Sequence, residues 1–594
     1  MHGPKRTTAM YPPVDLGAGG VAAYDAEAPV IAAAETIPFR LRVGVSGHRR
    51  LTNAEELRRS VAHVLDEIPA YLPAHETPVT YRVVSPLAEG ADRLVAGCVL
   101  SRADADLMVS LPFNRERYME DFADERSRAE FQELYESAVF HTVAKSHGGL
   151  SDEECYELGG QEVVEHSDVL IALWDGLPAR GAGGTAAIVE YARGGTRAGI
   201  ASERHRRGPS RSPGERRIPV FVVRTDRAGV VESLFEDGDW SEVRSAYKDL
   251  HHFNRLRPPG RALRKELARN ESELQAGAAA FGEKRQEAKT RTRFHEVTLS
   301  LEGWLFPVFV KADTAATSFR NKVLGFGVAT AVFAAAAVAA AAARVVYAPR
   351  ATLLTWIEVL LMATVVAGRL TIVHQRAHRR WVTLRALAEM LRVMPYSALA
   401  DPRHFTAGNG DERGGSHAVR PPTVQLEWYR RTVDELWRRR PRITLTQMDV
   451  PWLRTLILQR WIAGQIDYHT RRGQHHRLWH RLLRGGVLAA FVGTLVCALA
   501  HALGDGGTTT AFLTVALPAA GGALSYIEAH REHGRHAERY TWTVNQLRDL
   551  QRRGEHAEHV GELRLIARRM FELMNTENAD WAEVMWVHDV ELAV

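Results

Sequence analysis

Residues suited to binding an anionic ligand cluster in a short segment near the beginning of the chain. The segment VGVSGHRR leaves an apolar run and brings Ser46, Gly47, His48 and Arg49 together. Glycine lets the backbone approach a ligand closely, and the helix predicted to follow at LTNAEEL offers amide groups at its first turn. Together with an arginine, these groups favour an anion such as a phosphate.

Two further segments combine glycine with polar groups after an apolar run. SPLAEGADRLVAG and WDGLPARGAGGTAAIVEYAR each place glycine at a predicted helix start. Three such loops at one edge of a sheet predict a nucleotide-shaped cleft. The candidate ligand-binding residues in these loops are Ser46, Gly47, His48, Arg49, Glu89, Gly90, Ala91, Asp92, Arg93, Asp175, Gly183, Gly184 and Thr185.

Each loop taken alone also fits ordinary turn chemistry, and Asp92 and Arg93 also fit a solvated pair in a first helical turn. The segments contain neither the GxxxxGK[ST] phosphate loop nor the GxGxxG fingerprint, so nucleotide triphosphate hydrolysis and ordinary dinucleotide redox chemistry are not indicated. Trp174 fits either the core or a position near a base. Three tyrosines fit either half-buried packing or a fence around the cleft: Tyr118, Tyr135 and Tyr156,.

The elements that must hold these loops are apolar runs of strand length, separated by helical segments. The strand-like runs are LRVGVSG, TYRVVSPL, ADLMVSLPF, DVLIALWD and IPVFVVRT. Nearly continuous apolar strands that alternate with helices are typical of a doubly wound parallel sheet, in which ligands bind at the carboxyl ends of the strands. We therefore predict a Rossmann-like α/β domain over residues 38–226, with an exposed basic loop at 202–217.

The segments on either side of this domain are expected to be a mobile arm at residues 1–37 and a helical linker or stalk at residues 227–300. The arm lacks the charged and then apolar order of a signal peptide. The linker is rich in charged helix formers, and we expect it to pass the state of the α/β domain onward.

Composition indicates a reducing compartment and a membrane surface. The three cysteines, Cys98, Cys155 and Cys497, show no CxxC spacing, so neither a disulfide framework nor a zinc site is supported,. The formal net charge of +5 is small for 594 residues, and the arginines cluster beside apolar stretches. A bilayer is therefore the expected partner rather than nucleic acid, and no resident metal or cofactor is expected.

Four stretches in the second half of the chain are long and apolar enough to cross a bilayer as helices. They lie at about residues 323–343, 351–368, 485–504 and 507–527, and their tight connections make two hairpins,. Buried helices of a soluble protein are the alternative. The hairpin units are expected at residues 301–398 and 423–594, with a linker at 399–422. The fold class is thus an α/β domain followed by an all-α membrane region.

Orientation follows from the distribution of basic residues. Arginine and histidine flank one set of span ends, whereas the connecting turns carry only Arg344 and Arg350 in the first hairpin and no basic residue in the second. The positive-inside rule predicts a multi-pass protein of the inner or plasma membrane, with the α/β domain and both termini in the cytoplasm.

Glu358 is the candidate pore or gating residue, because an ionisable group inside a span usually faces a bundle interior or a water path. An interhelical polar contact is the alternative. His476 and His480 have helical metal-ligand spacing, but the neighbouring arginines favour a lipid-facing role. Gly521 and Gly522 permit close packing of helices. Four spans per chain make a homo-oligomeric pore the natural assembly.

The motifs GVSGHR, SPLAEGADRLVA, SDVLIALWDG and GGTAAIVEYAR resemble the SLOG superfamily of Rossmann-like nucleotide-sensing domains, over about residues 38–226. That superfamily includes the sensor of TRPM channels, the DprA fold and the LOG phosphoribohydrolases. The resemblance implies that the candidate residues, and with them Gly44 of the first motif, bind a nucleotide-derived signal, similar to ADP-ribose or a cyclic nucleotide. LOG hydrolases carry PGGxGTxxE, whereas here the proline is missing, Ile188 takes the glutamate position and Glu190 lies two residues later. This departure favours sensing over hydrolysis.

The segment QRWIAGQIDYHTRRGQHHRLWHRL, the two spans after it and FELMNTENADWAEVMW resemble the SLATT family over about residues 423–594. SLATT proteins have two spans and are proposed to be pore-forming effectors in bacterial conflict. The residues that match the family best are Gln465, Tyr468, Glu577 and Trp581. Residues 301–398 resemble the same unit more weakly.

Together, the two resemblances imply a sensor of a nucleotide signal, not an enzyme, coupled to a pore-forming or ion-conducting effector in bacterial stress or antiviral defence. The alternatives are a membrane-tethered enzyme similar to the phosphoribohydrolases and a noncatalytic membrane scaffold.

Overall fold

The computed structural model describes residues 36–74, 76–144, 151–178, 183–195, 217–227, 229–257, 260–261, 265, 268, 285–374, 376–400, 405–406, 417–418 and 427–591. Most of the arm expected at 1–37 and of the basic loop expected at 202–217 lies outside these residues. Of the linker expected at 399–422, two short strands are described, β8 (Phe405–Thr406) and β9 (His417–Ala418), which pair in parallel.

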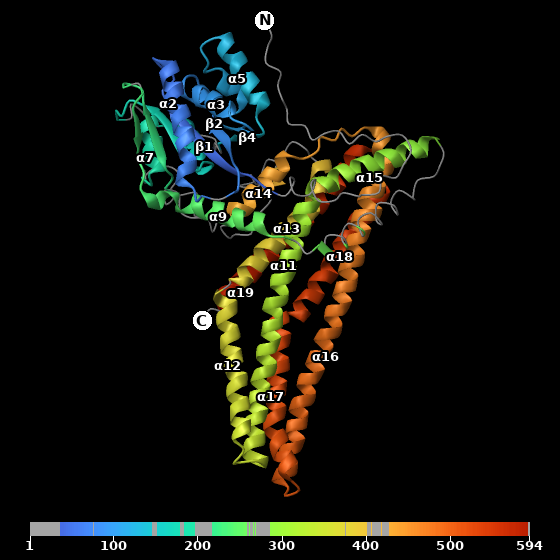
Figure 1. Ribbon diagram of the computed structural model, residues 1–594. Helices are drawn as coiled ribbons and strands as arrows, with labels where there is room; N and C mark the ends of the chain where they lie inside the picture. Colours follow the sequence, from blue (N-terminus) through green and yellow to red (C-terminus); the bar gives the residue numbers. More distant parts are fainter. Residues whose placement is uncertain are drawn as a thin grey trace.

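The α/β domain is built on a seven-stranded sheet in the order β4-β3-β2-β1-β5-β6-β7 (Figure 1). The five predicted strands are confirmed as β1 (Phe39–Gly47), β2 (Val79–Ser85), β3 (Asp106–Leu111), β5 (Val169–Trp174) and β6 (Val220–Arg224). All five are parallel to their neighbours among this set. Their side chains are almost entirely buried, because helices cover both faces,.

Two strands at the edges of the sheet were not predicted. The first is β4 (Phe140–Val143), parallel to β3, and the second is β7 (Val231–Ser233), antiparallel to β6. The sheet therefore continues past the boundary expected at residue 226. The antiparallel β7 and the helix α9 (Ser241–Arg255) replace the first part of the expected stalk.

Helices from different parts of the chain cover the two faces of the sheet. Alternate residues of β1 and β5 pack with α2 (Ala54–Glu67) and α3 (Ala91–Leu100) on one face. On the other face, Leu170 and Ala172 of β5 pack with α7 (Thr185–Ala192) and α6 (Asp152–Glu165). Two further helices, α4 (Arg115–Met119) and α5 (Glu125–Ser137), lie between β3 and β4. The predicted doubly wound fold is confirmed.

The rest of the chain is helical and contains the four predicted apolar stretches. The helix α11 (Arg285–Tyr347) continues through the boundary expected at residue 300, and α12 (Thr352–His374) returns beside it. The second hairpin consists of α16 (Ala463–Ala502) and α17 (Thr508–Arg531). The remaining long helices are α13 (Ala377–Ala400), α14 (Glu427–Arg438), α18 (His533–Glu555) and α19 (Val560–Glu591). A short α15 (Val450–Arg454) and a π-helix (Thr455–Ile462) lead directly into α16.

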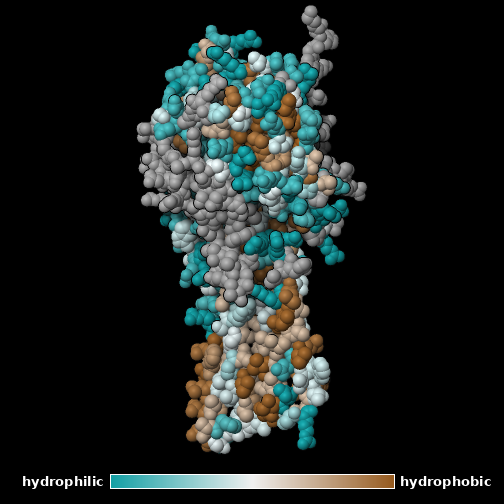
Figure 2. Space-filling model, turned by 90° about the vertical axis from the view of Figure 1, so that its left-hand side faces the viewer, coloured by the Kyte–Doolittle hydropathy of each residue, from teal (hydrophilic) through white to brown (hydrophobic). Residues whose placement is uncertain are grey.

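The four apolar helices form a long shaft with both hairpin turns at the end far from the α/β domain (Figure 1). They pack in the order α12, α11, α17, α16. Four helical stretches among the described residues, Gly303–Tyr347, Thr352–Thr371, Gln447–Ala502 and Thr508–Glu555, are long and apolar enough to cross a membrane. Hydrophobic surface gathers along the lower shaft, whereas the domain above it is mainly hydrophilic (Figure 2). The chain thus has the architecture of a multi-pass membrane protein.

Candidate functional site

The strand order places the three candidate loops at one edge of the sheet. Because β1 lies between β2 and β5, the loops after these three strands are neighbours at the carboxyl edge. The chain runs outward from β1 to β4 on one side and returns to β5 on the other, so the switch point lies between β1 and β5. This is the position where ligands bind in open α/β sheets.

The loops after β1 and β5 contact each other through His48 and Asp175. The amide of Asp175 donates to His48 Nε2 at 3.2 Å, and the same nitrogen lies 3.4 Å from Asp175 Oδ1. The amide of His48 donates to the carbonyl of Leu173 at 3.1 Å. Both side chains are partly exposed where the loops after β1 and β5 meet.

Gly47 and Gly90 allow the loops after β1 and β2 to pack together. A Cβ at Gly47 would lie 2.4 Å from the Cβ of Ala91, and one at Gly90 would lie 2.3 Å from the carbonyl oxygen of Arg49. Gly90 also has a φ of 83°, which favours glycine,. The amide of Ala91 donates to the carbonyl of His48 at 3.1 Å. The first amide of α3 is therefore used inside the protein.

Two of the expected ligand-binding residues instead hold the loop that precedes α3. Asp92 and Arg93 are both buried, so the alternative that they form a solvated pair in the first turn of the helix is wrong. Asp92 Oδ2 accepts from the amide of Ala88 at 3.2 Å, and burial raises the pKa of Asp92 to about 7,. Arg93 Nε donates to the carbonyl of Leu87 at 3.1 Å, and its Nη1 contacts Glu130 at 2.8 Å. Arg93 is thus a positioning residue.

Glu89 is tied to the segment before α5. Its carboxylate accepts from the hydroxyl of Ser127 and, at 3.2 Å, from the amide of Ala123. Ser127 also accepts from Arg93 Nη1 at 3.0 Å. These contacts join the loop after β2 to the helices between β3 and β4.

Arg49 is the candidate cation that is exposed at the edge of the sheet. Its guanidinium lies 5.4 Å from the centroid of the Tyr156 ring, and the hydroxyl of Tyr156 donates to Asp121. Tyr156 is half-buried and borders Arg49, whereas Tyr118 is buried in the core. Tyr135 packs on Phe131 and His141. Of the three tyrosines, Tyr156 is the one in contact with Arg49.

The third loop brings α7 close to α6. Gly183 has a φ of 78°, and a Cβ there would lie 2.8 Å from the amide nitrogen of Glu157. Gly184 precedes α7, and its carbonyl accepts from the amides of Ala187 and Ile188. Thr185 begins the helix and is half-buried. Residues 179–182 of this loop lie outside the described part of the chain.

Two of the predicted residues do not lie on the surface of the carboxyl edge. Gly44 lies within β1, and a Cβ there would be 2.4 Å from the hydroxyl oxygen of Ser167, so it is a packing residue below α6. Ser46 pairs in register with Ala172 and is half-buried near the end of the strand.

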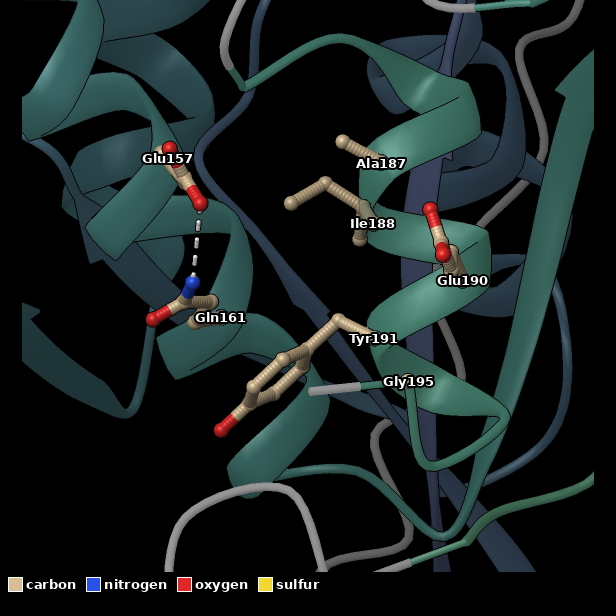
Figure 3. A pocket seen from close by; sticks show the side chains of 7 residues that line it. All are labelled: Glu157, Gln161, Ala187, Ile188, Glu190, Tyr191 and Gly195. Carbon is tan, nitrogen blue, oxygen red and sulfur yellow. Dashed lines mark hydrogen bonds between the residues drawn. The ribbon is translucent and has the colours of Figure 1, made fainter. Parts of the chain in front are cut away.

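Two hollows border α7. The first, between α6 and α7, has a volume of 10 Å³, about the size of one water molecule (Figure 3),. The second has a volume of 890 Å³ and is lined by Trp174, Arg193, Arg224 and Glu190, among others. Half-buried Trp174 packs on the core and also borders this hollow. Neither hollow is lined by the loops after β1 and β2.

Ile188 and Glu190 occupy different environments on α7. Ile188 is buried, and a Cβ at Gly160 would lie 2.4 Å from its Cδ1, so this side chain packs against α6. Glu190 is exposed at the border of both hollows. Ile188, three residues after Thr185, is therefore an apolar packing residue.

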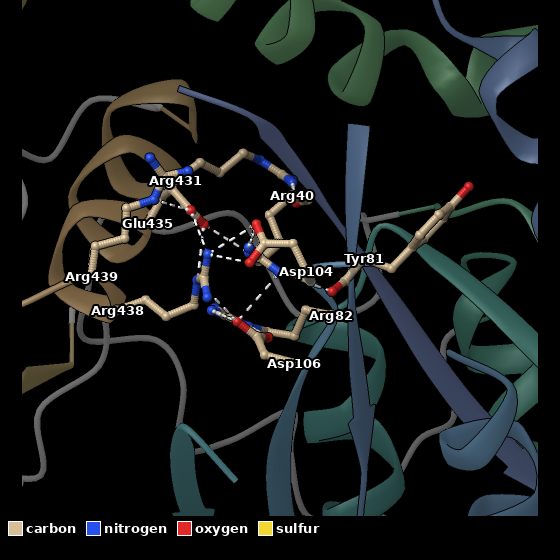
Figure 4. A network of polar contacts seen from close by, with 9 residues as sticks. All are labelled: Arg40, Tyr81, Arg82, Asp104, Asp106, Arg431, Glu435, Arg438 and Arg439. Atoms are coloured by element: carbon tan, nitrogen blue, oxygen red, sulfur yellow. Dashed lines mark hydrogen bonds and ion pairs between the residues drawn. The ribbon is translucent and has the colours of Figure 1, made fainter. Parts of the chain in front are cut away.

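Sequence reasoning missed a polar network at the opposite, amino-terminal edge of the sheet (Figure 4). Here charged groups of the strands meet charged groups of α14, and we call them the amino-edge network. Its members are Arg40, Arg42, Arg82, Asp104, Asp106, Asp168, Glu427, Arg431, Glu435 and Arg438. One signal in the sequence could have predicted this network. Arginines lie inside apolar runs that were expected to be buried strands, and a buried charge needs a partner of opposite charge.

The candidate residues in the membrane region lie in several environments. Glu358 is half-buried on α12, and none of the ion pairs found among the described residues includes it. His480 Nδ1 lies 2.8 Å from Glu528, and His476 Nδ1 lies 3.0 Å from His533 Nδ1, so both histidines contact protein. The described residues contain no group of three or more side chains arranged to hold a metal ion.

The two glycines expected at helix contacts, and the four residues that carry the resemblance to SLATT proteins, lie in helices of the membrane region and of the C-terminal segment. A Cβ at Gly521 would lie 3.3 Å from the Cβ of Ala490, so Gly521 permits close packing of α17 on α16, whereas a Cβ at Gly522 would point into open space. Glu577 pairs with Arg539 at 3.3 Å, and Trp581 lies 6.0 Å from Trp381. Gln465 and Tyr468 lie in the first turns of α16.

Comparison of the chain with protein-family models, curated proteins and solved structures gave no match. The fold and the site therefore define the class of protein by themselves. It is a multi-pass membrane protein that carries a Rossmann-like α/β domain.

Proposed function

We propose that this protein is a membrane-anchored sensor of a nucleotide-derived signal, coupled to an ion-conducting or pore-forming effector. The observation that carries the proposal is the position of Arg49. Its exposed guanidinium lies at the switch point of an open α/β sheet, in a chain that also has four helices able to span a membrane. A phosphate-bearing ligand is the natural partner for such an edge.

The candidate residues have different roles in this proposal. Arg49 contacts the ligand anion, and His48 and Asp175 form the floor beside it. Asp92, Arg93 and Glu89 hold the loop in place through the contacts described above. The close approach of Gly47 and Gly90 brings the backbone of two loops near the ligand,.

The α/β domain and both termini are proposed to lie on the cytoplasmic side of the inner or plasma membrane. Support comes from the hairpin turns, which lie at the far end of the shaft and carry few basic residues (Figure 1). The helix ends nearer the α/β domain carry many arginines, including Arg477 and Arg481 of α16. This distribution follows the positive-inside rule.

A homo-oligomer is proposed because α12 lies at one edge of the four-helix shaft. Its large apolar side chains Leu353, Trp356 and Leu360 are each more than 65% exposed, and Glu358 lies on the same helix. An ionisable group facing lipid is costly, so another subunit or a water path beside Glu358 is favoured. The resemblance to SLOG and SLATT proteins supports a role in bacterial stress or antiviral defence.

Ligand binding is tested by thermal stabilisation of the purified full chain with ADP-ribose, cyclic AMP and other adenine nucleotides. A saturating ligand at about 100 times its Kd stabilises the folded state by about 2.7 kcal/mol, so a binder raises the Tm by several degrees. No shift with any nucleotide would contradict the sensor.

An enzyme is the second candidate, because Glu190 borders the 890 Å³ hollow together with Arg193 and Arg224. A carboxylate beside guanidinium groups fits acid–base work on a nucleotide. Release of base or ribose phosphate that disappears in Glu190→Gln would establish this function. A noncatalytic scaffold would neither consume nucleotide nor conduct ions.

A further inference from the structure

Helix α14 lies between the sheet and the first spanning helix, although in sequence it lies between the two hairpins (Figure 1). Glu427, Arg431, Glu435 and Arg438 are separated by four, four and three residues, so they share one face of α14,. This face meets the amino-terminal edge of the sheet. The candidate ligand site lies at the carboxyl edge, at the other ends of the same strands.

Arg431 connects α14 to β1 and β5 at once. Its Nη1 donates to Asp168 Oδ2 at 2.7 Å and to the carbonyl of Arg40 at 2.8 Å, while Nη2 donates to Asp168 Oδ1. Asp168 directly precedes β5, and Arg40 belongs to β1. Arg431 also lies 4.6 Å from the centroid of the Phe39 ring. One side chain therefore bridges the two strands that flank the candidate cleft.

Further ion pairs fix the orientation of α14 on the sheet. Arg40 Nε contacts Glu435 at 2.7 Å, and Arg438 Nη2 contacts Asp104 at 2.8 Å (Figure 4). Arg40 and Glu435 are both buried. Charge-assisted pairs of this kind have a defined geometry, so a shift of β1 is passed to α14 rather than absorbed.

Two buried carboxyl groups of the amino-edge network, those of Asp168 and Glu435, stay ionised because arginines lie beside them. Burial alone would raise the pKa of Asp168, but Arg42 and Arg431 hold it well below its ordinary value,. The same balance, with Arg40 as the main cation, lowers the pKa of Glu435 to about 2. Both carboxylates are thus ionised at neutral pH, and the contacts are ion pairs.

Other residues of α14 contact the first spanning helix. Trp304 of α11 donates from Nε1 to the carbonyl of Leu436 at 2.8 Å, and its ring lies 6.1 Å from that of Trp437. Trp437 and Leu436 are buried in this contact. Helix α14 therefore joins the sheet to the helix that enters the membrane.

A second route from the α/β domain to α11 passes through α9. Lys311 Nζ of α11 donates to the carbonyl of Asn254 at 3.0 Å and lies 5.4 Å from the centroid of the Phe253 ring. This contact belongs to the segment expected to act as the stalk. This route also reaches the start of β1, because the Asn254 side chain accepts from the amide of Ile37 at 3.0 Å and donates to its carbonyl at 2.9 Å. None of these contacts involves Arg431, so the two routes can be tested separately.

We propose that α14 is the coupling element of this protein: ligand-dependent changes in the spacing of β1 and β5 pass through Arg431 to α14 and then through Trp304 to α11. The ligand-dependent part rests on the proposed function. The mechanical connection between sheet and span does not, and it is tested without ligand.

The first experiment is hydrogen exchange on the full chain in lipid nanodiscs, without nucleotide. Arg431→Gln is expected to speed exchange at least tenfold at the amino ends of β1 and β5 and also in α11 around Trp304. Arg430→Gln, which removes the neighbouring arginine on α14, is the matched control and is expected to leave both segments unchanged. Faster exchange in the strands with unchanged exchange in α11 overturns the proposal.

Two further variants keep this test decisive if Arg431→Gln does not fold. Arg438→Gln lies at the more exposed end of the face and is expected to give the same pattern with a smaller rise. Trp304→Phe removes the indole donor from the other side and is expected to speed exchange at Arg40 and Arg42. If the effect of Trp304→Phe stops at α14, the coupling is refuted.

The second experiment adds ADP-ribose and measures ion flux in proteoliposomes. Wild type and Lys311→Met are expected to respond, whereas Arg431→Gln is expected to bind with a Kd within threefold of wild type and to lose at least nine-tenths of the response. Loss of the response in Lys311→Met alone would assign coupling to α9. If wild type responds neither to ADP-ribose nor to cyclic AMP and the other adenine nucleotides, the proposed function fails, while the hydrogen exchange still decides the role of α14.

Discussion

Asp168 and Arg431 lie 263 residues apart in sequence and form a buried, two-point ion pair in which Arg431 Nη1 lies 2.7 Å from Asp168 Oδ2. Asp168 directly precedes the strand β5, and Arg431 belongs to the helix that precedes the second hairpin. Their side chains are 1% and 4% exposed, so neither charge is compensated by water. The α/β domain and the helical region are therefore joined by a contact that requires both partners.

The Asp168–Arg431 pair makes a strong prediction about stability. Arg431→Gln leaves Asp168 buried with Arg42 as its remaining cation, and removing one partner of a buried pair costs about 3–5 kcal/mol,. We expect the α/β domain in the full chain to melt roughly 10 °C lower. Arg439 directly follows α14, is half-buried and pairs with Glu435 of that helix, so Arg439→Gln should lower the Tm far less. Equal melting of both variants would show that the pair contributes little.

A second prediction concerns the pH dependence of the loop before α3. Because burial raises the pKa of Asp92 to about 7, its neutral form contributes stability that is present below the ordinary pKa of 3.8 and is lost as pH rises through 7,. Wild type should lose roughly 2–3 kcal/mol more than Asp92→Asn between pH 5 and pH 8. Chemical unfolding of the full chain at both pH values measures this difference, and parallel curves for the two proteins would refute it.

The close contact of the first two loops predicts opposite effects for two glycine substitutions. A Cβ at Gly47 would lie 2.8 Å from the carbonyl of Leu173 as well as 2.4 Å from Ala91, so Gly47→Ala should cost about 2 kcal/mol or more,. A Cβ at Gly97 of α3 would meet only Arg58 Nη1, at an ordinary contact distance of 3.8 Å, so Gly97→Ala should stabilise the helix by about 0.5–1 kcal/mol,. Thermal unfolding distinguishes them, and tolerance of Gly47→Ala would mean that the loops separate easily.

Replacing Arg49 or Arg93 by alanine is predicted to affect different properties, nucleotide binding for Arg49 and thermal stability for Arg93. Arg49→Ala should weaken nucleotide binding about 10- to 100-fold with little change in Tm, because a charged hydrogen bond contributes about 1.5–3 kcal/mol. Arg93→Ala should lower the Tm, because it removes contacts to Leu87, Ser127 and Glu130. Arg50→Ala is the neighbouring control. Binding that is equal in Arg49→Ala and wild type would remove Arg49 from the site.

Much of the fold was predictable because its signals are local. The strands β1, β2, β3, β5 and β6 were expected from apolar runs, and the four spans from long stretches without charge. The edge strands β4 and β7 were missed because they are short and their side chains are partly exposed. Such segments carry little apolar pattern, and their strand pairing depends on neighbours that are distant in sequence.

The sequence was sufficient to predict which loops form the candidate site, but not which side chains in them face a ligand and which hold the loops in place. The crossover rules for parallel sheets limit the possible strand orders, and ligands of such sheets bind at the carboxyl edge. Whether Arg93 faces a ligand or the carbonyl of Leu87 depends on the packing of α4 and α5, which no local pattern records. The amino-edge network was hidden for the same reason, since EWYRRTVDELWRRR has the pattern of a solvated amphipathic helix.

The measurement that tests the central claim most directly is ion flux through liposomes that contain the full chain, challenged with ADP-ribose, cyclic AMP and other adenine nucleotides. The account predicts that at least one nucleotide changes the flux tenfold or more, and that Arg49→Ala needs at least ten times more of it while Arg50→Ala does not. Flux that is independent of every nucleotide, in liposomes where the protein is folded and inserted, would contradict the account.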